Sequence, residues 1–155
     1  MFQAIKQYLN SRGWNYQLSQ QQGHQIFKLQ LHGENGAISC VIDVQEETVI
    51  LFTIFPVNAP QEKRHAMAEL ITRINFKLLL GHFELDFEDG EVRFNLSWHF
   101  DDTVPVSDAV IEHNIMACAI ISDKFIPAIM RINFSNITPV MALEEVEGVS
   151  RSSLN

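Results

Sequence analysis

The chain has 155 residues, a length typical of one domain, and 46% of them are hydrophobic, which excludes intrinsic disorder. Its formal charge of -8 gives the long-range field the wrong sign for a nucleic-acid backbone, and no basic cluster is longer than Lys63-Arg64. The apolar runs are too short to span a bilayer and the first residues lack a signal-peptide pattern. We therefore expect a cytoplasmic protein with no nucleic-acid or membrane partner.

The first predicted elements are a helix and a meander of strands. Apolar residues recur at helical spacing from Phe2 to Leu9, and Gly13 is placed to end this helix in a left-handed conformation. Residues 16–18 are predicted to form at most a short extended piece, followed by a polar loop at 19–23. Alternating patterns then predict three strands, over residues 27–32, 37–44 and 48–55.

The second and third of these strands are apolar on both faces. A turn at Glu46-Glu47 would place Val44 opposite Val49 on one face, whereas a three-residue turn would shift this register. On the other face lie four apolar residues, Val41, Ile50, Phe52 and Ile54. One helical layer cannot cover both faces, so either the first helix or the tail covers the second face, or this face is an interface.

A second helix and a hairpin follow. The helix is predicted to begin at the capping sequence from Asn58 to Gln61 and to end at Gly81. Alternation from Phe83 to Phe100 around Asp89-Gly90 predicts a two-residue turn. This turn would pair Phe87 with Val92, Leu85 with Phe94, Phe83 with Leu96 and Asp86 with Arg93, and it would oppose Glu88 and Glu91.

The last predicted element is helical and begins after Ser107, which is placed to cap it. Pro127 leaves two alternatives open, two helices restarting near Asp123 or one kinked helix to about Ile132. Residues 135–155 are expected to be a mostly flexible tail with at most a short helix over Val140 to Val146. The sequence thus predicts a single α+β domain over residues 1–134, with helices on an antiparallel, mainly five-stranded sheet and the order α-β-β-β-α-β-β-α.

Candidate chemistry is sparse. The acids between Glu84 and Glu91 lack the spacing of a calcium loop, and no histidine pair has the spacing of a zinc site. Cys40 and Cys118 are isolated, and His113 lies five positions from Cys118, so the two do not share a helix face. We therefore predict no catalytic residue, no metal and no cofactor, and a protein that is not an enzyme.

Three segments at the centre of the chain carry a family resemblance: Ile74-Asn75, Gly81 to Asp86, and Asp89 to Phe94. With the order of elements, they make the region from Phe2 to Ile132 resemble the YbjN-like family, which belongs to the type III secretion chaperone-like fold superfamily. The resemblance implies a small, acidic, often dimeric bacterial protein that regulates sensory transduction. It supplies no catalytic residue.

Two functions of different class remain. The first, which we favour, is a non-enzymatic protein-binding module, chaperone-like or a regulatory adaptor, whose apolar strand face or sheet edge receives a peptide or a second copy. The second is a small-ligand sensor or cryptic enzyme with an apolar pocket between the sheet and the C-terminal helical region. A large apolar patch would favour the first, and a closed concavity the second.

Overall fold

A computed structural model describes residues 1–101 and 103–152. The described residues form a six-stranded antiparallel sheet in the order β1-β2-β3-β4-β6-β5. Its strands are β1 (Gln17–Gln21), β2 (His24–His32), β3 (Ala37–Val44), β4 (Thr48–Ile54), β5 (His82–Leu85) and β6 (Val92–His99). The helices are α1 (Phe2–Ser11), α2 (Arg64–Asn75), α3 (Asp108–Phe134) and α4 (Pro139–Ser152), with a 3₁₀ turn, η1 (Gln61–Lys63), before α2.

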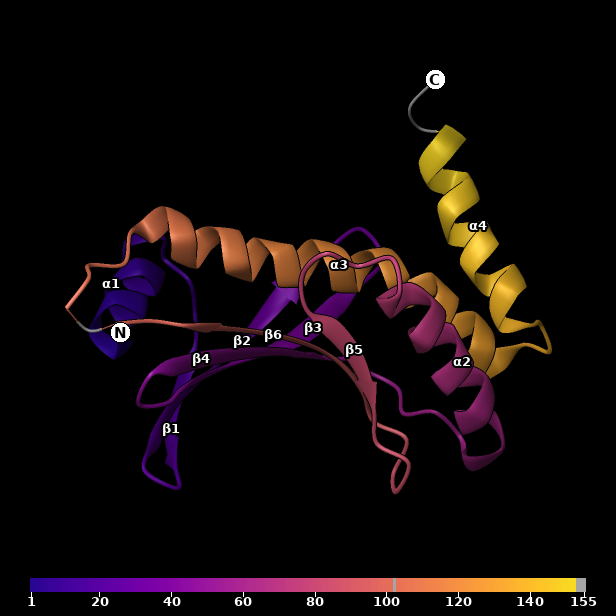
Figure 1. Cartoon of the computed structure of the whole chain (residues 1–155), viewed down its shortest axis with the longest axis horizontal. Helices are drawn as coiled ribbons and strands as arrows, with labels where there is room; N and C mark the ends of the chain where they lie inside the picture. The colour runs from indigo at the N-terminus through magenta and orange to yellow at the C-terminus, as the bar shows by residue number, and fades with distance from the viewer. Residues whose placement is uncertain (102, 153–155) are drawn as a thin grey trace.

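The helices gather on one side of the sheet (Figure 1). The long helix α3 crosses this side, α1 and α2 lie near its two ends, and α4 projects from its C-terminal end. Alternate residues of the strands are buried beneath the helices, among them Phe27, Ile42, Leu51 and Phe94. The α+β class is therefore confirmed, although the sheet has six strands where the sequence predicts five.

The additional strand is β1, which forms a hairpin with β2. Gln21 pairs with His24 across a two-residue turn. Both turn residues have positive φ, 50° at Gln22 and 88° at Gly23, as the tightest hairpin turns require. β1 is almost wholly exposed and polar, so it lacks the alternation by which a strand is recognised in a sequence.

The predicted register of β3 and β4 is confirmed. Val44 pairs with Val49, and the backbone N–H of Gln45 donates to the carbonyl of Thr48 at 2.9 Å, which closes the turn at Glu46-Glu47. The second face consequently carries the pairs Val41–Phe52, Asp43–Ile50 and Ser39–Ile54, which include the four apolar residues predicted for this face.

The predicted register of the β5–β6 hairpin is wrong by two residues. Phe83 pairs with Phe94 and Glu84 with Arg93, and residues 86–91 form a longer loop in place of a two-residue turn. Phe87, expected opposite Val92 in the core, is 51% exposed. A slip of two keeps every strand residue on its predicted face, because side chains alternate with a period of two.

The longer loop is held by the first residue of α2 and by the chain that precedes this helix. Arg64 Nη1 donates to the carbonyl of Phe87 at 2.7 Å, and the N–H of Ala59 donates to the carbonyl of Gly90 at 2.7 Å. Gly90 has φ +84°, and a Cβ there would lie 2.1 Å from the oxygen of Ala59. Asn58, predicted to cap the helix, donates to the carbonyl of Asp89 in this loop, while α2 itself begins at Arg64.

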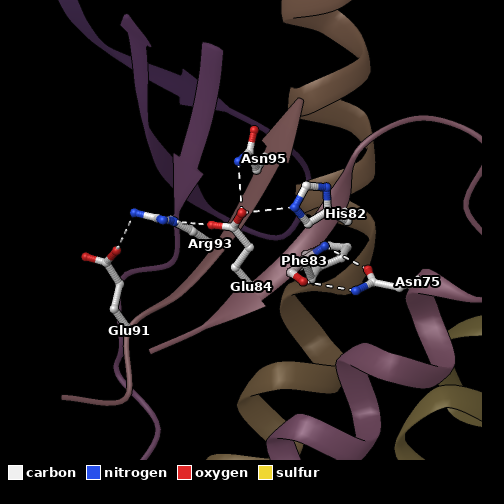
Figure 2. Close-up of polar contacts among 7 residues, drawn as sticks. All are labelled: Asn75, His82, Phe83, Glu84, Glu91, Arg93 and Asn95. Carbon is white, nitrogen blue, oxygen red and sulfur yellow. Dashed lines mark hydrogen bonds and ion pairs between the residues drawn. The ribbon is translucent and has the colours of Figure 1, made fainter. Parts of the chain in front are cut away.

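Helix α2 ends at Asn75, six residues before the predicted end at Gly81. The following turn leaves Phe76 and Leu79 92% and 99% exposed. The Asn75 side chain explains the early end, since it accepts from the N–H of Phe83 at 2.7 Å and donates to the carbonyl of Phe83 at 2.9 Å (Figure 2). These bonds require the chain to turn back immediately towards β5.

Helix α3 is continuous from Asp108 to Phe134 with Pro127 inside it, so the second of the two alternatives, a single helix, is correct. Residues 139–152 form α4, which is longer than the short helix expected in a mostly flexible tail. One side of α4 buries Ala142, Leu143 and Val146, and ion pairs join Arg131 to Glu145 and Lys77 to Glu147. Among the described residues, no helix is both long and apolar enough to cross a membrane.

Candidate interaction face

The four residues proposed as an interaction face lie together on the side of the sheet opposite the helices. We call this side the open face. Val41, Ile50, Phe52 and Ile54 are all half-buried, and the pair Val41–Phe52 lies at their centre. In Figure 1 the β1–β2 and β5–β6 turns both extend away from the helices, so the sheet curves towards its open face.

The sequence allows the first helix or the C-terminal tail to cover the open face, but neither α1 nor α4 lies on it in the described part of the chain. Helix α1 packs on the covered face, where the Phe2 and Phe27 rings stack with centroids 5.3 Å apart. Helix α4 contacts α2 and α3 and so lies on the helical side. The half-burial of Phe52 comes partly from Arg93, whose guanidinium carbon lies 4.6 Å from the centre of the ring.

A polar cluster borders the apolar residues, and Glu84 is its centre (Figure 2). Glu84 Oε2 accepts from Arg93 Nε at 2.5 Å, and Glu84 Oε1 accepts from Asn95 Nδ2 at 2.9 Å. His82 Nε2 lies 2.9 Å from Glu84 Oε1, and Glu91 lies 3.8 Å from Arg93. The register places Glu84 opposite Arg93, where the sequence predicts Asp86.

The environment of Glu84 keeps it ionised. Partial burial raises its pKa, but hydrogen bonds from Asn95, Arg93 and His82, together with the positive charge of Arg93, outweigh this effect and hold the pKa below its ordinary value of 4.5. A carboxylate with a low pKa and several donors is a poor proton acceptor at neutral pH. The cluster therefore supplies fixed charges to the border of the open face.

A second charged group lies at the other end of this face. His24 Nδ1 lies 3.5 Å from Asp43 Oδ1, and Gln45 Nε2 donates to Asp43 Oδ2 at 3.0 Å. The apolar centre thus has a carboxylate and a basic side chain at each end. Sequence reasoning missed the first group because the predicted register of the hairpin paired Arg93 with Asp86 in place of Glu84. It missed the second because His24 lies outside the predicted strand 27–32, whereas β2 begins at His24.

The residues that could have formed a catalytic or metal site have surroundings that favour neither role. Burial raises the pKa of the Cys118 thiol to about 12 and also raises that of Cys40, so neither is a reactive thiolate. Glu112 is paired with Arg12 at 2.7 Å on the surface. Within the described part of the chain, no three His, Cys, Asp or Glu side chains gather in a group that could hold a metal.

The pocket expected between the sheet and the C-terminal helices does not lie at the centre of the interface between the sheet and α3. Buried side chains of α3, including Ile111, Ile115 and Cys118, fill its interface with the sheet. A cavity of about 710 Å³ lies outside this interface, between α3, α4 and the β2–β3 turn, where Met116, Ile120 and Pro127 line it. It is open to solvent and does not form the closed concavity that a sensor would favour.

Comparisons with known proteins agree with this architecture. The crystal structure of YbjN, "a putative transcription regulator from E. coli", is similar with a TM-score of 0.60 and 15% identity, over 79% of this chain and 86% of that one. No curated protein sequence matches the chain. The sequence profile of YbjN, described as "Putative bacterial sensory transduction regulator", matches residues 2–131 and ends before α4. The chain therefore belongs to the YbjN family.

Proposed function

We propose that this protein is a non-enzymatic, cytoplasmic regulator that acts by binding proteins, as a chaperone-like or regulatory adaptor, and that a second copy covers its open face. The observation that carries the proposal is the apolar centre formed by Val41, Ile50, Phe52 and Ile54, which no described element of the chain covers. Apolar residues gathered on one exposed face commonly mark an interaction site.

The charges at the border favour a second copy as the cover. Glu84 and Arg93 lie at one end of the open face, and Asp43 and His24 lie at the other. Two copies related by a two-fold axis can place the carboxylate of one end near the basic group of the other, so the surface is self-complementary. The family description as a regulator supports a binding role, and the buried free thiols fit a reducing compartment.

Substitution of Phe52 by Glu tests the proposal. The new carboxylate would lie beside Arg93, which can pair with it, so the monomer is expected to keep its fold. Sedimentation velocity over a range of concentrations should show a dimer for the unchanged protein and at least a tenfold weaker dimer for Phe52→Glu. Far-UV circular dichroism should be the same for both.

Phe134→Glu is the matched control, because Phe134 is 67% exposed at the end of α3, on the helical side. It should leave the dimer unchanged. A wild-type protein that sediments as a monomer at every concentration would exclude a second copy as the cover. Loss of folded structure in Phe52→Glu, together with a monomeric wild type, would contradict the interface proposal altogether.

A small-ligand sensor is the second candidate, and the cavity of about 710 Å³ beside α4 is the observation that favours it. Its volume is within the range of small-molecule sites. Ile120 lines this cavity and is 63% exposed. Replacement of Ile120 by Trp would narrow the cavity and alter its apolar wall, so a sensor should bind its ligand more weakly, whereas the proposed dimer should be unaffected.

A further inference from the structure

Part of strand β2 has no described strand paired with it on its outer side. Strand β1 pairs with β2 only from His24 to Lys28, whereas β2 continues to His32 and pairs with β3 from Gln25 to His32. Residues 29–32 of β2 are therefore an edge of the sheet, and we call them the free edge. No other strand among the described residues lies beside it.

The phase of the hydrogen bonds shows which backbone groups face outwards. The N–H of Gly33 donates to the carbonyl of Gly36 at 2.9 Å, which makes these two residues a hydrogen-bonded pair. Such pairs alternate along an antiparallel ladder, so the backbone groups of Leu29 and Leu31 face β3. The N–H and C=O groups of Gln30 and His32 consequently face outwards along the free edge.

At the opposite edge of the sheet, on β5, a side chain occupies outward-facing backbone groups. On β5, the same alternation makes Phe83 face outwards, and the Asn75 side chain occupies both its N–H and its C=O (Figure 2). Natural sheets commonly protect their edges in this way, because unpaired backbone groups attract other strands. No side chain among the described residues bonds to the backbone of Gln30 on the free edge. The side-chain amide of Gln30 itself donates to Ser39 Oγ on the open face at 2.9 Å.

A groove of about 1010 Å³ runs along the free edge. Its lining comes from both faces of the sheet: Trp14, Tyr16 and Met116 on the helical side, and Lys28, Val41 and Ile54 on the open face. Although the chain carries a net charge of -8, the described residues that line this groove include Lys28 and His32 but no carboxylate. The groove thus differs in charge from the protein as a whole.

We propose that this groove binds an extended segment of a partner protein, which adds to the sheet beside β2 as a strand in line with β1. The inference rests on the proposed function and names the form in which a partner is recognised. An extended segment is the occupant that the groove favours, because it alone presents alternating N–H and C=O groups to both Gln30 and His32. The absence of lining carboxylates favours a segment that is neutral or acidic over a basic one.

The alternation of β2 also defines the side chains of the segment. Residues opposite Leu29 and Leu31 would point to the helical side, where Trp14, Tyr16 and Met116 form an apolar wall. Residues opposite Gln30 would point to the open face, near Lys28. The expected motif is therefore four to five residues long, about the length of the free edge, with apolar residues alternating with acidic or neutral polar ones.

Amide hydrogen exchange followed by NMR tests the free edge in the intact protein. The amides of Leu29 and Leu31 should exchange slowly because they face β3, whereas those of Gln30 and His32 should exchange at least tenfold faster. Slow exchange at Gln30 and His32 at all protein concentrations would overturn the inference. Protection that increases with protein concentration would also overturn it, by identifying a second copy as the occupant.

Selection from a displayed library of random 12-residue peptides tests the occupant. Peptides enriched on the wild-type protein should show the alternating motif and should slow the exchange of Gln30 and His32 at least tenfold. Gln30→Pro removes one outward N–H and should weaken the binding of these peptides at least tenfold. Gln30→Ala keeps that N–H, so its affinity for the peptides should be within about twofold of that of the wild type. Lys28→Glu should weaken the binding of acidic peptides, and this variant tests the groove even if Gln30→Pro fails to fold.

The outcomes separate this inference from the proposed function. If no peptide is enriched, or if the enriched peptides bind Gln30→Pro and Lys28→Glu as well as the wild type, the groove does not bind extended segments. If enriched peptides instead lose binding only in Phe52→Glu, the open face is the peptide site and the inference about the free edge fails. Dimerisation that depends on Phe52 would support the proposed function in either case.

Discussion

Asn35, in the turn between β2 and β3, is bonded to Asp123 in the middle of α3 through both its backbone and its side chain. The Asp123 carboxylate accepts from the Asn35 N–H at 2.9 Å, from Asn35 Nδ2 at 3.2 Å and from the Glu34 N–H at 3.1 Å. Asn35 Nδ2 also donates to the carbonyl of Asp123 at 3.1 Å. Pro127, four residues later, has no N–H to offer this carbonyl, so the turn replaces the missing helical bond.

Asp123→Ala should lower the free energy of unfolding by about 2 kcal/mol, because hydrogen bonds to a charged acceptor contribute roughly 1.5 to 3 kcal/mol. Urea unfolding followed by circular dichroism measures this change. Asp108→Ala, in the first turn of the same helix, is a suitable control and should cost less than about 1 kcal/mol. An equal loss in both variants would show that the contact between the turn and α3 contributes little.

Gly33→Ala should also destabilise the protein, because a Cβ at position 33 would lie 2.1 Å from Asp123 Oδ1. The two closest contacts of this added Cβ, with Oδ1 at 2.1 Å and Cγ at 2.2 Å, disappear when the carboxylate is removed, and the contact with the Asp123 Cβ at 2.8 Å remains. In an Asp123→Ala background, therefore, the same substitution should cost markedly less. A double-mutant cycle on the unfolding free energy measures this coupling. Additive effects would contradict the close approach of the two residues.

Asn75→Ala should cost about 2 kcal/mol of unfolding free energy, because it leaves the N–H and C=O of Phe83 without their side-chain partner. Asn114→Ala removes a comparable amide, whose Nδ2 donates to the carbonyl of Val110 within α3, and should change stability by less than about 0.5 kcal/mol. Chemical denaturation of the two variants makes the comparison. Similar losses would mean that the edge of β5 does not depend on Asn75.

Glu84→Gln should change the pH dependence of stability. A carboxyl whose pKa is lower in the folded state stabilises the protein above its unfolded pKa, and this contribution is lost as the pH falls through the folded pKa. The wild type should thus be more stable than Glu84→Gln at neutral pH, by less than ~1 kcal/mol at this partly exposed site. The difference should shrink as the pH falls below 4.5. If the difference in stability between the two proteins were constant from pH 7 to pH 3, the lowered pKa of Glu84 would be contradicted.

Leu143→Ala tests the docking of α4. Leu143 is 6% exposed, so the substitution should cost about 2 to 4 kcal/mol in thermal or chemical unfolding. Met141, two positions earlier on the same helix, is 49% exposed, and Met141→Ala should be nearly neutral. If Leu143→Ala were also neutral, α4 would contribute little to the folded domain. The domain boundary at residue 134 stays a prediction.

The sequence determined the features that depend on local periodicity. Val44 and Val49 are brought together by a tight turn between two short apolar strands, and the structure has this register. Gly13 ends α1 with φ +67°, as its place after the helical pattern predicts. The helical pattern is present on both sides of Pro127, and only the structure shows that the two parts form one helix. The faces of the strands were also predictable, since even the slip of the β5–β6 hairpin by two residues keeps Phe83 and Phe94 buried.

The tertiary structure decided the features for which several local conformations are nearly equal in energy. Asp89-Gly90 is compatible with a tight turn, but Arg64 and Ala59 bind the longer loop and so set the register of β6. The helical pattern could continue to Gly81, yet Asn75 ends α2 by bonding to Phe83. The open face and the free edge arise in the same way, because only the assembled sheet determines which side the helices cover and where β1 stops pairing.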